Sequence, residues 1–151
     1  MYSIDTSAVL DGWIRYYPPD VFGTVWAHLE QLGRSGQLFA TEEVIVELEK
    51  KDEAAHAWSK RSLTVQPLDT AIQVAVAAIL ANHQRLVDTR KNRSQADPFV
   101  IALAQLRGFA VVTGERPTGR PDRPHIPDVC TALNIMCISL LELFREQGLR
   151  V

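Results

Sequence analysis

One stretch of the sequence carries the pattern of an α/β unit: Ser94-Gln-Ala-Asp-Pro-Phe-Val-Ile-Ala-Leu-Ala-Gln-Leu-Arg-Gly108, followed by Phe109-Ala-Val-Val-Thr113-Gly-Glu115. Within a helix, proline fits the first turn, so Pro98 predicts a helix with Asp97 as its N-cap and Gly108 as its end. This helix is apolar on almost every side, which is typical of a core helix. Residues 109–112 then read as a parallel strand buried on both faces.

Strands and helices alternate along the rest of the chain. Strands are predicted over residues 2–5, 38–40, 63–65, 109–112 and 135–138. Helices are predicted after Thr6-Ser7, from Asp20 to Gly33, after Thr41, over 52–61, from Asp69 beyond Leu86, and from Ser139 to Gly148. This alternation indicates a three-layer α/β/α fold with a central, mostly parallel five-stranded sheet. The chain has 151 residues and no dividing linker, so we expect a single domain over 1–151.

The composition excludes several classes of protein. Hydrophobic residues make up 46% and charged residues 23%, as in ordinary globular proteins. No apolar stretch is long enough to span a membrane, and the N-terminus lacks the basic-then-apolar order of a secretion signal. Cys130 and Cys137 do not form a C-x-x-C motif, so we expect two buried thiols in a reducing, cytoplasmic setting.

Positive charge is concentrated in one part of the chain. Residues 1–84 hold 11 acids and 6 bases, whereas residues 85–123 hold 8 bases and 4 acids. The 8 bases are Arg85, Arg90, Lys91, Arg93, Arg107, Arg116, Arg120 and Arg123. Such a zone can attract a polyanion although the net charge is −2. Each base also has a simpler interpretation as an ordinary solubility charge.

Four acids occupy comparable places in the predicted fold. Asp5 ends the first strand, Glu115 follows the fourth, and Asp97 heads the core helix. Glu47 interrupts the apolar face of the helix that follows Thr41. In a parallel sheet, strand C-termini and the following helix N-termini share one edge. Carboxylates meeting there repel unless a cation neutralises them, and oxygen ligands of this kind predict Mg²⁺ or Mn²⁺.

Each acid also has a structural interpretation when it is taken alone. Asp97 is explained as a helix cap and Asp5 as a cap or turn residue. Glu115 is explained as a solvated loop charge, and Glu47 reaches solvent from the flank of its helix. The functional argument depends on the joint placement of the four acids.

Four short motifs, in this order, span most of the chain. They are Ile4-Asp5-Thr6-Ser7, Thr41-Glu-Glu-Val-Ile-Val-Glu47-Leu48, Ala96-Asp97-Pro98-Phe99-Val100-Ile101-Ala102 and Val112-Thr113-Gly-Glu115. With them the sequence resembles the PIN-domain ribonucleases, and the VapC-type toxins in particular. The resemblance implies a PIN-like fold and a Mg²⁺- or Mn²⁺-dependent endonuclease that cuts RNA to leave a 5′-phosphate. It also implies a toxin with a cognate antitoxin protein.

The same resemblance implies roles for the acids. Asp5, Glu47 and Asp97 match the metal-binding, catalytic carboxylates of the family. At the fourth position the family commonly has aspartate, where this chain has Glu115, and the tail Ile126-Pro-Asp-Val-Cys130 looks like a less-characterised PIN subfamily with Thr-x-Glu. Glu115 is therefore expected to be catalytic, binding the metal directly or through water.

Two further expectations concern partners. Arg90, Lys91 and Arg93 precede Asp97, and Arg116, Arg120 and Arg123 follow Glu115, so we expect these six to hold the RNA backbone on both sides of the acids. Aromatic residues near the N-terminus either line a homodimer interface, as PIN domains often pair, or pack in the core. They are Trp13, Tyr16, Tyr17, Phe22 and Trp26.

Three other functions share part of this pattern. A haloacid-dehalogenase-type phosphatase needs a second aspartate two residues after Asp5, where this chain has Ser7. A response-regulator receiver needs a lysine near the fifth strand, and residues 135–138 have none beside them. The remaining alternative is a non-catalytic PIN-like domain that binds RNA or a protein partner.

Overall fold

A computed structural model describes residues 1–87 and 95–151. Its strands are β1 (Tyr2–Ile4), β2 (Leu38–Thr41), β3 (Thr64–Gln66), β4 (Ala110–Val112) and β5 (Cys137–Ile138). Its α-helices are α1 (Thr6–Asp11), α2 (Gly23–Arg34), α3 (Glu42–Lys51), α4 (Glu53–Ser62), α5 (Thr70–Asn82), α6 (Asp97–Arg107), α7 (Ile126–Ala132) and α8 (Leu140–Glu146). A π-helical segment, Gly12–Tyr16, extends α1, and a 3₁₀ turn, Gln84–Leu86, follows α5.

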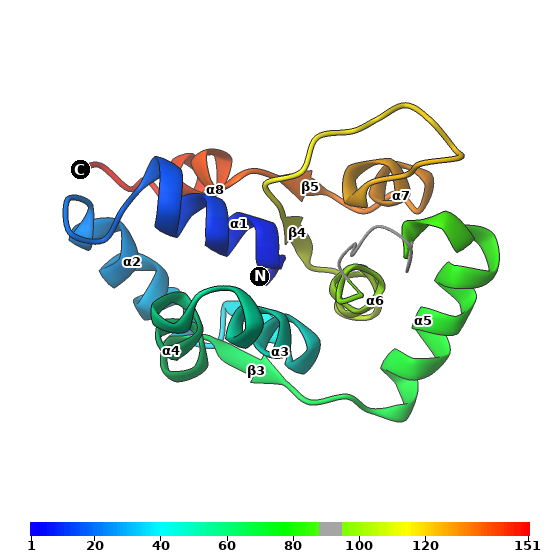
Figure 1. Ribbon diagram of the computed structural model, residues 1–151, viewed down its shortest axis with the longest axis horizontal. Coiled ribbons are helices and arrows are strands. Elements are labelled where there is room, and N and C mark those ends of the chain that lie inside the picture. The colour runs from blue at the N-terminus through cyan, green and yellow to red at the C-terminus, as the bar shows by residue number, and fades with distance from the viewer. Residues whose placement is uncertain (88–94) are drawn as a thin grey trace.

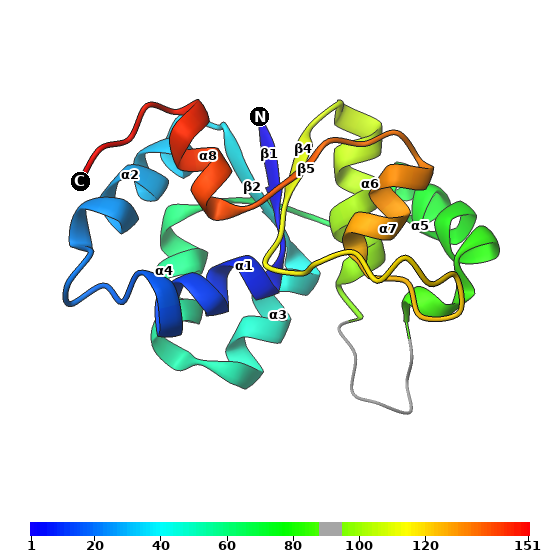
Figure 2. The same cartoon turned by 90° about the horizontal axis from the view of Figure 1, so that it is seen from above.

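The five strands form one sheet in the order β3-β2-β1-β4-β5, and every neighbouring pair is parallel. Helices α5, α6 and α7 cover one face of this sheet, and α1, α2, α3, α4 and α8 cover the other (Figures 1 and 2). The predicted three-layer α/β/α architecture is therefore confirmed. After β1 the chain adds β2 and then β3 on one side of β1, and it then crosses back to add β4 and β5 on the other side. The order of the strands therefore reverses between β1 and β4, which makes their junction the topological switch point.

The core helix predicted from the opening stretch is α6. Val100, Ile101, Ala102 and Leu103 are fully buried on it, and α6 packs on β1, β2 and β4. Its end at Gly108 is also confirmed, because this glycine adopts the left-handed conformation with φ 69°.

The start of α6 differs from the prediction by one residue. Asp97 is the first residue of the helix, and Ala96 is its N-cap. Pro98 is still compatible with this frame, because the N–H groups of the first turn have no partner within the helix. Asp97 thus carries its charge inside the first turn, where the helix dipole favours an anion.

Three predicted helix starts carry the expected caps, because the side chains of Thr41, Asp69 and Ser139 each accept a backbone N–H at the start of α3, α5 and α8. Asp52 caps α4 in the same way, which was not predicted. The second helix, in contrast, begins at Gly23 and not at Asp20. The N–H groups of Val21 and Phe22 both donate to the carbonyl of Pro18, and this turn absorbs the predicted first residues of the helix.

Most of the aromatic residues near the N-terminus pack against one another. Trp26 lies 4.7 Å from Trp13 and 4.8 Å from Trp58 between ring centroids, and both Trp26 and Trp58 are buried. Tyr16 is different, because 62% of its surface is exposed. Core packing thus accounts for the buried aromatics, and the homodimer stays a prediction.

Hydrophobic helices of this chain are short. Within residues 1–87 and 95–151, none has both the length and the hydropathy needed to cross a membrane.

Candidate functional site

The site forms where β1 and β4 end side by side. Ile4 pairs with Val112, so Asp5 and Thr113 leave the sheet together at its C-terminal edge. Ligands of open α/β sheets bind at this edge, in the crevice at the topological switch point. The fold therefore positions Asp5 where the sequence analysis expected a site.

Two hydroxyl groups hold the Asp5 carboxylate. Its Oδ2 accepts hydrogen bonds from the hydroxyls of Ser7, at 2.5 Å, and Thr113, at 2.9 Å. The Ser7 hydroxyl also accepts the N–H of Gly114 at 3.0 Å, so it joins the ends of β1 and β4. The other carboxylate oxygen, Oδ1, is buried and has no hydrogen-bond partner among the described residues.

Asp5 is 1% exposed, and its pKa is raised to about 7, mainly by this burial. The negative charges of Glu115 and Glu47 also contribute to the raised pKa, while the hydroxyls of Ser7 and Thr113 oppose it. Three of the four predicted acids are thus electrostatically coupled. The coupling is repulsive, as expected for carboxylates that share a site without a cation.

Glu47 and Asp97 meet at the N-terminus of α6. The Oε2 atom of Glu47, on α3, accepts the N–H of Ala96 at 3.2 Å. Ala96 is followed by Asp97, which is only 4% exposed. This hydrogen bond therefore places Glu47 next to Asp97.

Glu115 has a second, structural task. Its Oε2 atom accepts the N–H of Ile126 at 3.1 Å, at the start of α7, and its own N–H donates to the hydroxyl of Thr113 at 3.1 Å. The interpretation of Glu115 as a simple solvated charge is wrong, because its carboxylate caps a helix and acts on Asp5 as well.

The donor set fits a hard cation. Across the described ranges, no three carboxylate, imidazole or thiol groups are gathered closely enough to hold a metal ion by themselves. Mg²⁺, however, usually keeps several waters and binds through one or two carboxylates. The buried Oδ1 of Asp5 and the nearby charges of Glu47 and Glu115 are groups that such an ion would stabilise.

One acid of this region, Asp11, was not predicted from the sequence. A methyl group placed on Gly114 would come within 2.5 Å of the Asp11 carboxylate and 3.2 Å of the Ser7 carbonyl. Asp11 thus lies against the loop between Thr113 and Glu115. It sits in the last turn of α1, six residues after Asp5, and no motif marks it.

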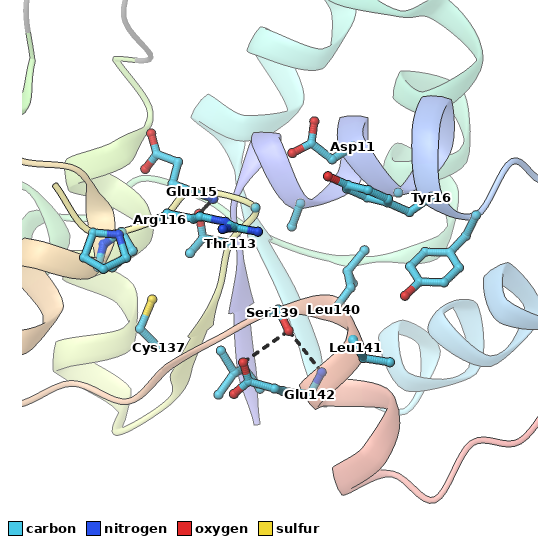
Figure 3. A pocket seen from close by; sticks show the side chains of 17 residues that line it. Asp11, Tyr16, Thr113, Glu115, Arg116, Cys137, Ser139, Leu140, Leu141 and Glu142 are labelled. Atoms are coloured by element: carbon cyan, nitrogen blue, oxygen red, sulfur yellow. Dashed lines mark hydrogen bonds between the residues drawn. The ribbon is translucent and has the colours of Figure 1, made fainter.

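A pocket of about 560 Å³ opens beside these acids. Figure 3 shows Asp11, Tyr16 and Arg116 along one side of it, and Ser139 with Leu140 and Glu142 of α8 along the other. Thr113 and Glu115 belong both to this pocket and to the carboxylate site.

The predicted exposed loop after Glu115 is held by hydrogen bonds to one residue, Asp128, which was not predicted from the sequence. The Asp128 carboxylate accepts the backbone N–H groups of Thr118, Gly119 and His125. Partial burial raises the pKa of Asp128, but these bonds outweigh it and lower the pKa to about 2. The loop is therefore irregular in its backbone but held in place at α7.

The six predicted RNA-binding bases fall into two groups. Arg90, Lys91 and Arg93 lie outside the described residues. Arg116, Arg120 and Arg123 are exposed on the loop that Asp128 holds, as expected. Arg120 forms an ion pair with Asp122 at 3.1 Å.

The two cysteines form a hydrogen-bonded pair beside the site. Cys130 is buried on α7, and Cys137, on β5, lines the pocket. The bond raises the pKa of the Cys130 thiol far above its usual range, with burial adding to the effect, and lowers the pKa of Cys137.

Among known protein families, residues 2–151 match the one described as "Domain of unknown function (DUF4411)". No curated protein matches the chain.

Proposed function

This chain belongs to the DUF4411 family, and we propose that it is a metal-dependent endoribonuclease that hydrolyses RNA phosphodiester bonds with Mg²⁺ or Mn²⁺. One observation carries the proposal: the buried Asp5 carboxylate, at the topological switch point, is coupled to the charges of Glu115 and Glu47. A cluster of this kind is costly to fold, so a task that requires a cation explains it better than structure alone. The resemblance to PIN-domain ribonucleases supports the choice of RNA.

In this proposal, different residues bind the metal and orient its ligands. Asp5, Glu47, Asp97 and Glu115 would hold the metal, directly or through its bound waters. When bound, Mg²⁺ supplies a water of lowered pKa and screens the charge of the phosphate. Ser7 and Thr113 fix the orientation of the Asp5 carboxylate through their hydroxyls.

The RNA backbone needs positive charge close to these acids, because carboxylates repel phosphate. Arg116, Arg120 and Arg123 are exposed on the loop after Glu115, and Arg116 also lines the pocket beside the acids. The proposed set also includes Arg90, Lys91 and Arg93, which precede Asp97 in the sequence. An exposed ion pair such as Arg120–Asp122 contributes little energy, so it does not prevent Arg120 from exchanging Asp122 for a phosphate.

The test is cleavage of labelled single-stranded RNA by the purified protein with Mg²⁺, Mn²⁺ or a chelator. Asp5→Asn, Glu47→Gln and Asp97→Asn should each lower cleavage at least about 100-fold, since even outer partners of metal ligands cost 10–100-fold. Asp20→Asn, at an exposed aspartate remote from the sheet edge, is the matched control. Metal-independent RNA binding without cleavage would instead favour the non-catalytic PIN-like domain.

The resemblance to VapC-type proteins extends the proposal to a cytoplasmic toxin with an antitoxin partner. Expression of the wild-type chain in a bacterial host should then arrest growth, and Asp5→Asn should relieve the arrest. Unimpaired growth at a verified level of wild-type protein would remove the toxin from the proposal and leave the nuclease.

A further inference from the structure

The pocket beside the acids has the composition of a nucleobase site. Its volume of about 560 Å³ lies within the usual range for small-ligand pockets. Ile138 and Leu140 and two prolines, Pro117 and Pro127, form apolar parts of its wall. Because the pocket shares Thr113 and Glu115 with the carboxylate site, its occupant lies directly next to that site.

Tyr16 offers an aromatic face at this pocket. Its ring is 62% exposed, whereas the neighbouring Trp26 is buried in the core. Tyr16 lines the pocket, and Figure 3 shows it near Asp11. Stacking on such a ring is a general way for proteins to bind the bases of single-stranded RNA.

Glu142 offers two acceptor oxygens on the opposite side. It belongs to the first turn of α8, where the Ser139 hydroxyl donates to its Oε1 at 3.3 Å and accepts its N–H at 3.1 Å. An ionised carboxylate only accepts hydrogen bonds. It therefore selects base edges that present N–H groups and disfavours those that present carbonyl oxygens.

The charge of the pocket points the same way. Among the residues that the structure describes, Asp11, Glu115 and Glu142 line it together with one cation, Arg116. A phosphate group is not expected to enter this negative environment, but a base rich in N–H donors is. Guanine is the base whose pairing edge carries adjacent N1–H and N2–H groups, which match the two oxygens of one carboxylate.

We propose that this pocket binds a guanine base of the RNA strand next to the bond that is cut. Tyr16 stacks on the base, Glu142 accepts its N1–H and N2–H groups, and Arg116 contacts the adjoining phosphate at the rim. The inference rests on the proposed ribonuclease function, which it deepens by naming the specificity-determining residues.

The first experiment measures nucleoside binding to the wild-type protein without metal, by calorimetry or ligand-observed NMR. Uncharged guanosine, adenosine, cytidine and uridine probe the pocket independently of catalysis. Guanosine should bind about 10-fold tighter than the other three, since a good bidentate contact discriminates bases by this order. Inosine, which lacks the N2 amino group, should fall between guanosine and adenosine.

Matched variants identify the contacts. Glu142→Gln should remove the preference for guanosine, whereas Glu53→Gln, an exposed first-turn glutamate of α4, should leave it intact. Tyr16→Phe should preserve binding, and Tyr16→Leu should weaken all four nucleosides roughly 5- to 100-fold. Equal affinity for all nucleosides, or a guanosine preference that survives Glu142→Gln, would overturn the proposal.

Cleavage mapping separates this inference from the proposed function. With Mg²⁺, the wild-type protein should cut a mixed-sequence RNA next to guanine, and Glu142→Gln should relax that choice. Cleavage without any dependence on guanine refutes the base pocket but leaves the ribonuclease standing. Guanosine binding with the expected variant effects, but without cleavage, supports the pocket and refutes the ribonuclease.

Discussion

Thr113 donates a hydrogen bond of 2.9 Å to the carboxylate of Asp5, although 108 positions separate the two residues in the chain. The parallel register of β1 and β4, in which Ile4 pairs with Val112, makes this contact. The centre of the candidate site is therefore set by the sheet, and changes to it should be felt both in stability and in the proposed chemistry.

The raised pKa of Asp5 predicts how the metal-free protein responds to pH. The pKa of Asp5 is about 7 in the folded protein, against 3.8 for an aspartate in an unfolded chain. At a pH between these two values, the folded protein therefore binds more protons than the unfolded chain. Stability should therefore fall as the pH rises from about 4 to about 7, by at most about 4 kcal/mol. Urea unfolding in a chelator at pH 5 and pH 8 measures the larger part of this difference.

Asp5→Asn should flatten that pH dependence and leave the protein at least as stable as wild type at pH 8, since the repulsion with Glu115 and Glu47 is removed. Asp20→Asn should retain the wild-type slope. If Asp5→Asn kept the full slope, the charge that opposes folding would have to reside elsewhere.

Two glycines of α2 test the packing of that helix. A methyl group on Gly33 would come within 2.0 Å of the Ser62 carbonyl oxygen, which belongs to the backbone and cannot yield easily. Gly33→Ala should therefore lower the free energy of unfolding by about 1–3 kcal/mol or more. Gly23→Ala, with no atom within 4 Å of the added methyl, should change it little or raise it slightly. Thermal unfolding of the two variants compares them directly.

The hydrogen bond within the cysteine pair predicts unequal reactivity. It lowers the pKa of Cys137, which lines the pocket, and raises that of the buried Cys130. Because the thiolate is the reactive form, iodoacetamide should alkylate Cys137 well before Cys130. Peptide mass spectrometry over time resolves the two sites, and Cys137→Ser should leave a protein that is alkylated only slowly. Faster labelling of Cys130 would contradict the pairing described here.

Salt dependence tests the proposed path of the RNA. If Arg116, Arg120 and Arg123 contact phosphates, their combined replacement by alanine should lower the slope of log affinity against log salt by roughly 0.7 per contact. The same holds for Arg90, Lys91 and Arg93. A control with alanine at Lys51, Lys60 and Arg61, exposed on α3 and α4, should keep the slope.

Glu115→Gln should act in the opposite way in the same titration. It should spare RNA binding and lower turnover, because the residue belongs to the acids and not to the proposed phosphate contacts. If the slope of log affinity against log salt is unchanged both when Arg116, Arg120 and Arg123 are replaced and when Arg90, Lys91 and Arg93 are replaced, the RNA must bind to another surface.

Local patterns in the sequence determined the elements and the edge at which the acids gather. Thr41, Asp69 and Ser139 cap the helices that they were expected to cap, and Gly108 ends the core helix. These features depend on groups a few residues apart, so they can be recognised without knowing the fold. The alternation of strands and helices then placed Asp5 and Glu115 at one sheet edge.

Tertiary structure alone decided what these acids touch. That the Glu115 carboxylate caps α7 at Ile126, that Asp128 holds the loop through Thr118, and that Asp11 lies against Gly114 all depend on segments brought together by packing. The pocket between the loop after β4 and the start of α8 arises in the same way. Contacts of this kind cannot be recognised from local sequence periodicity. Their geometry is set by sheet register and by helix packing between segments that are distant in the chain.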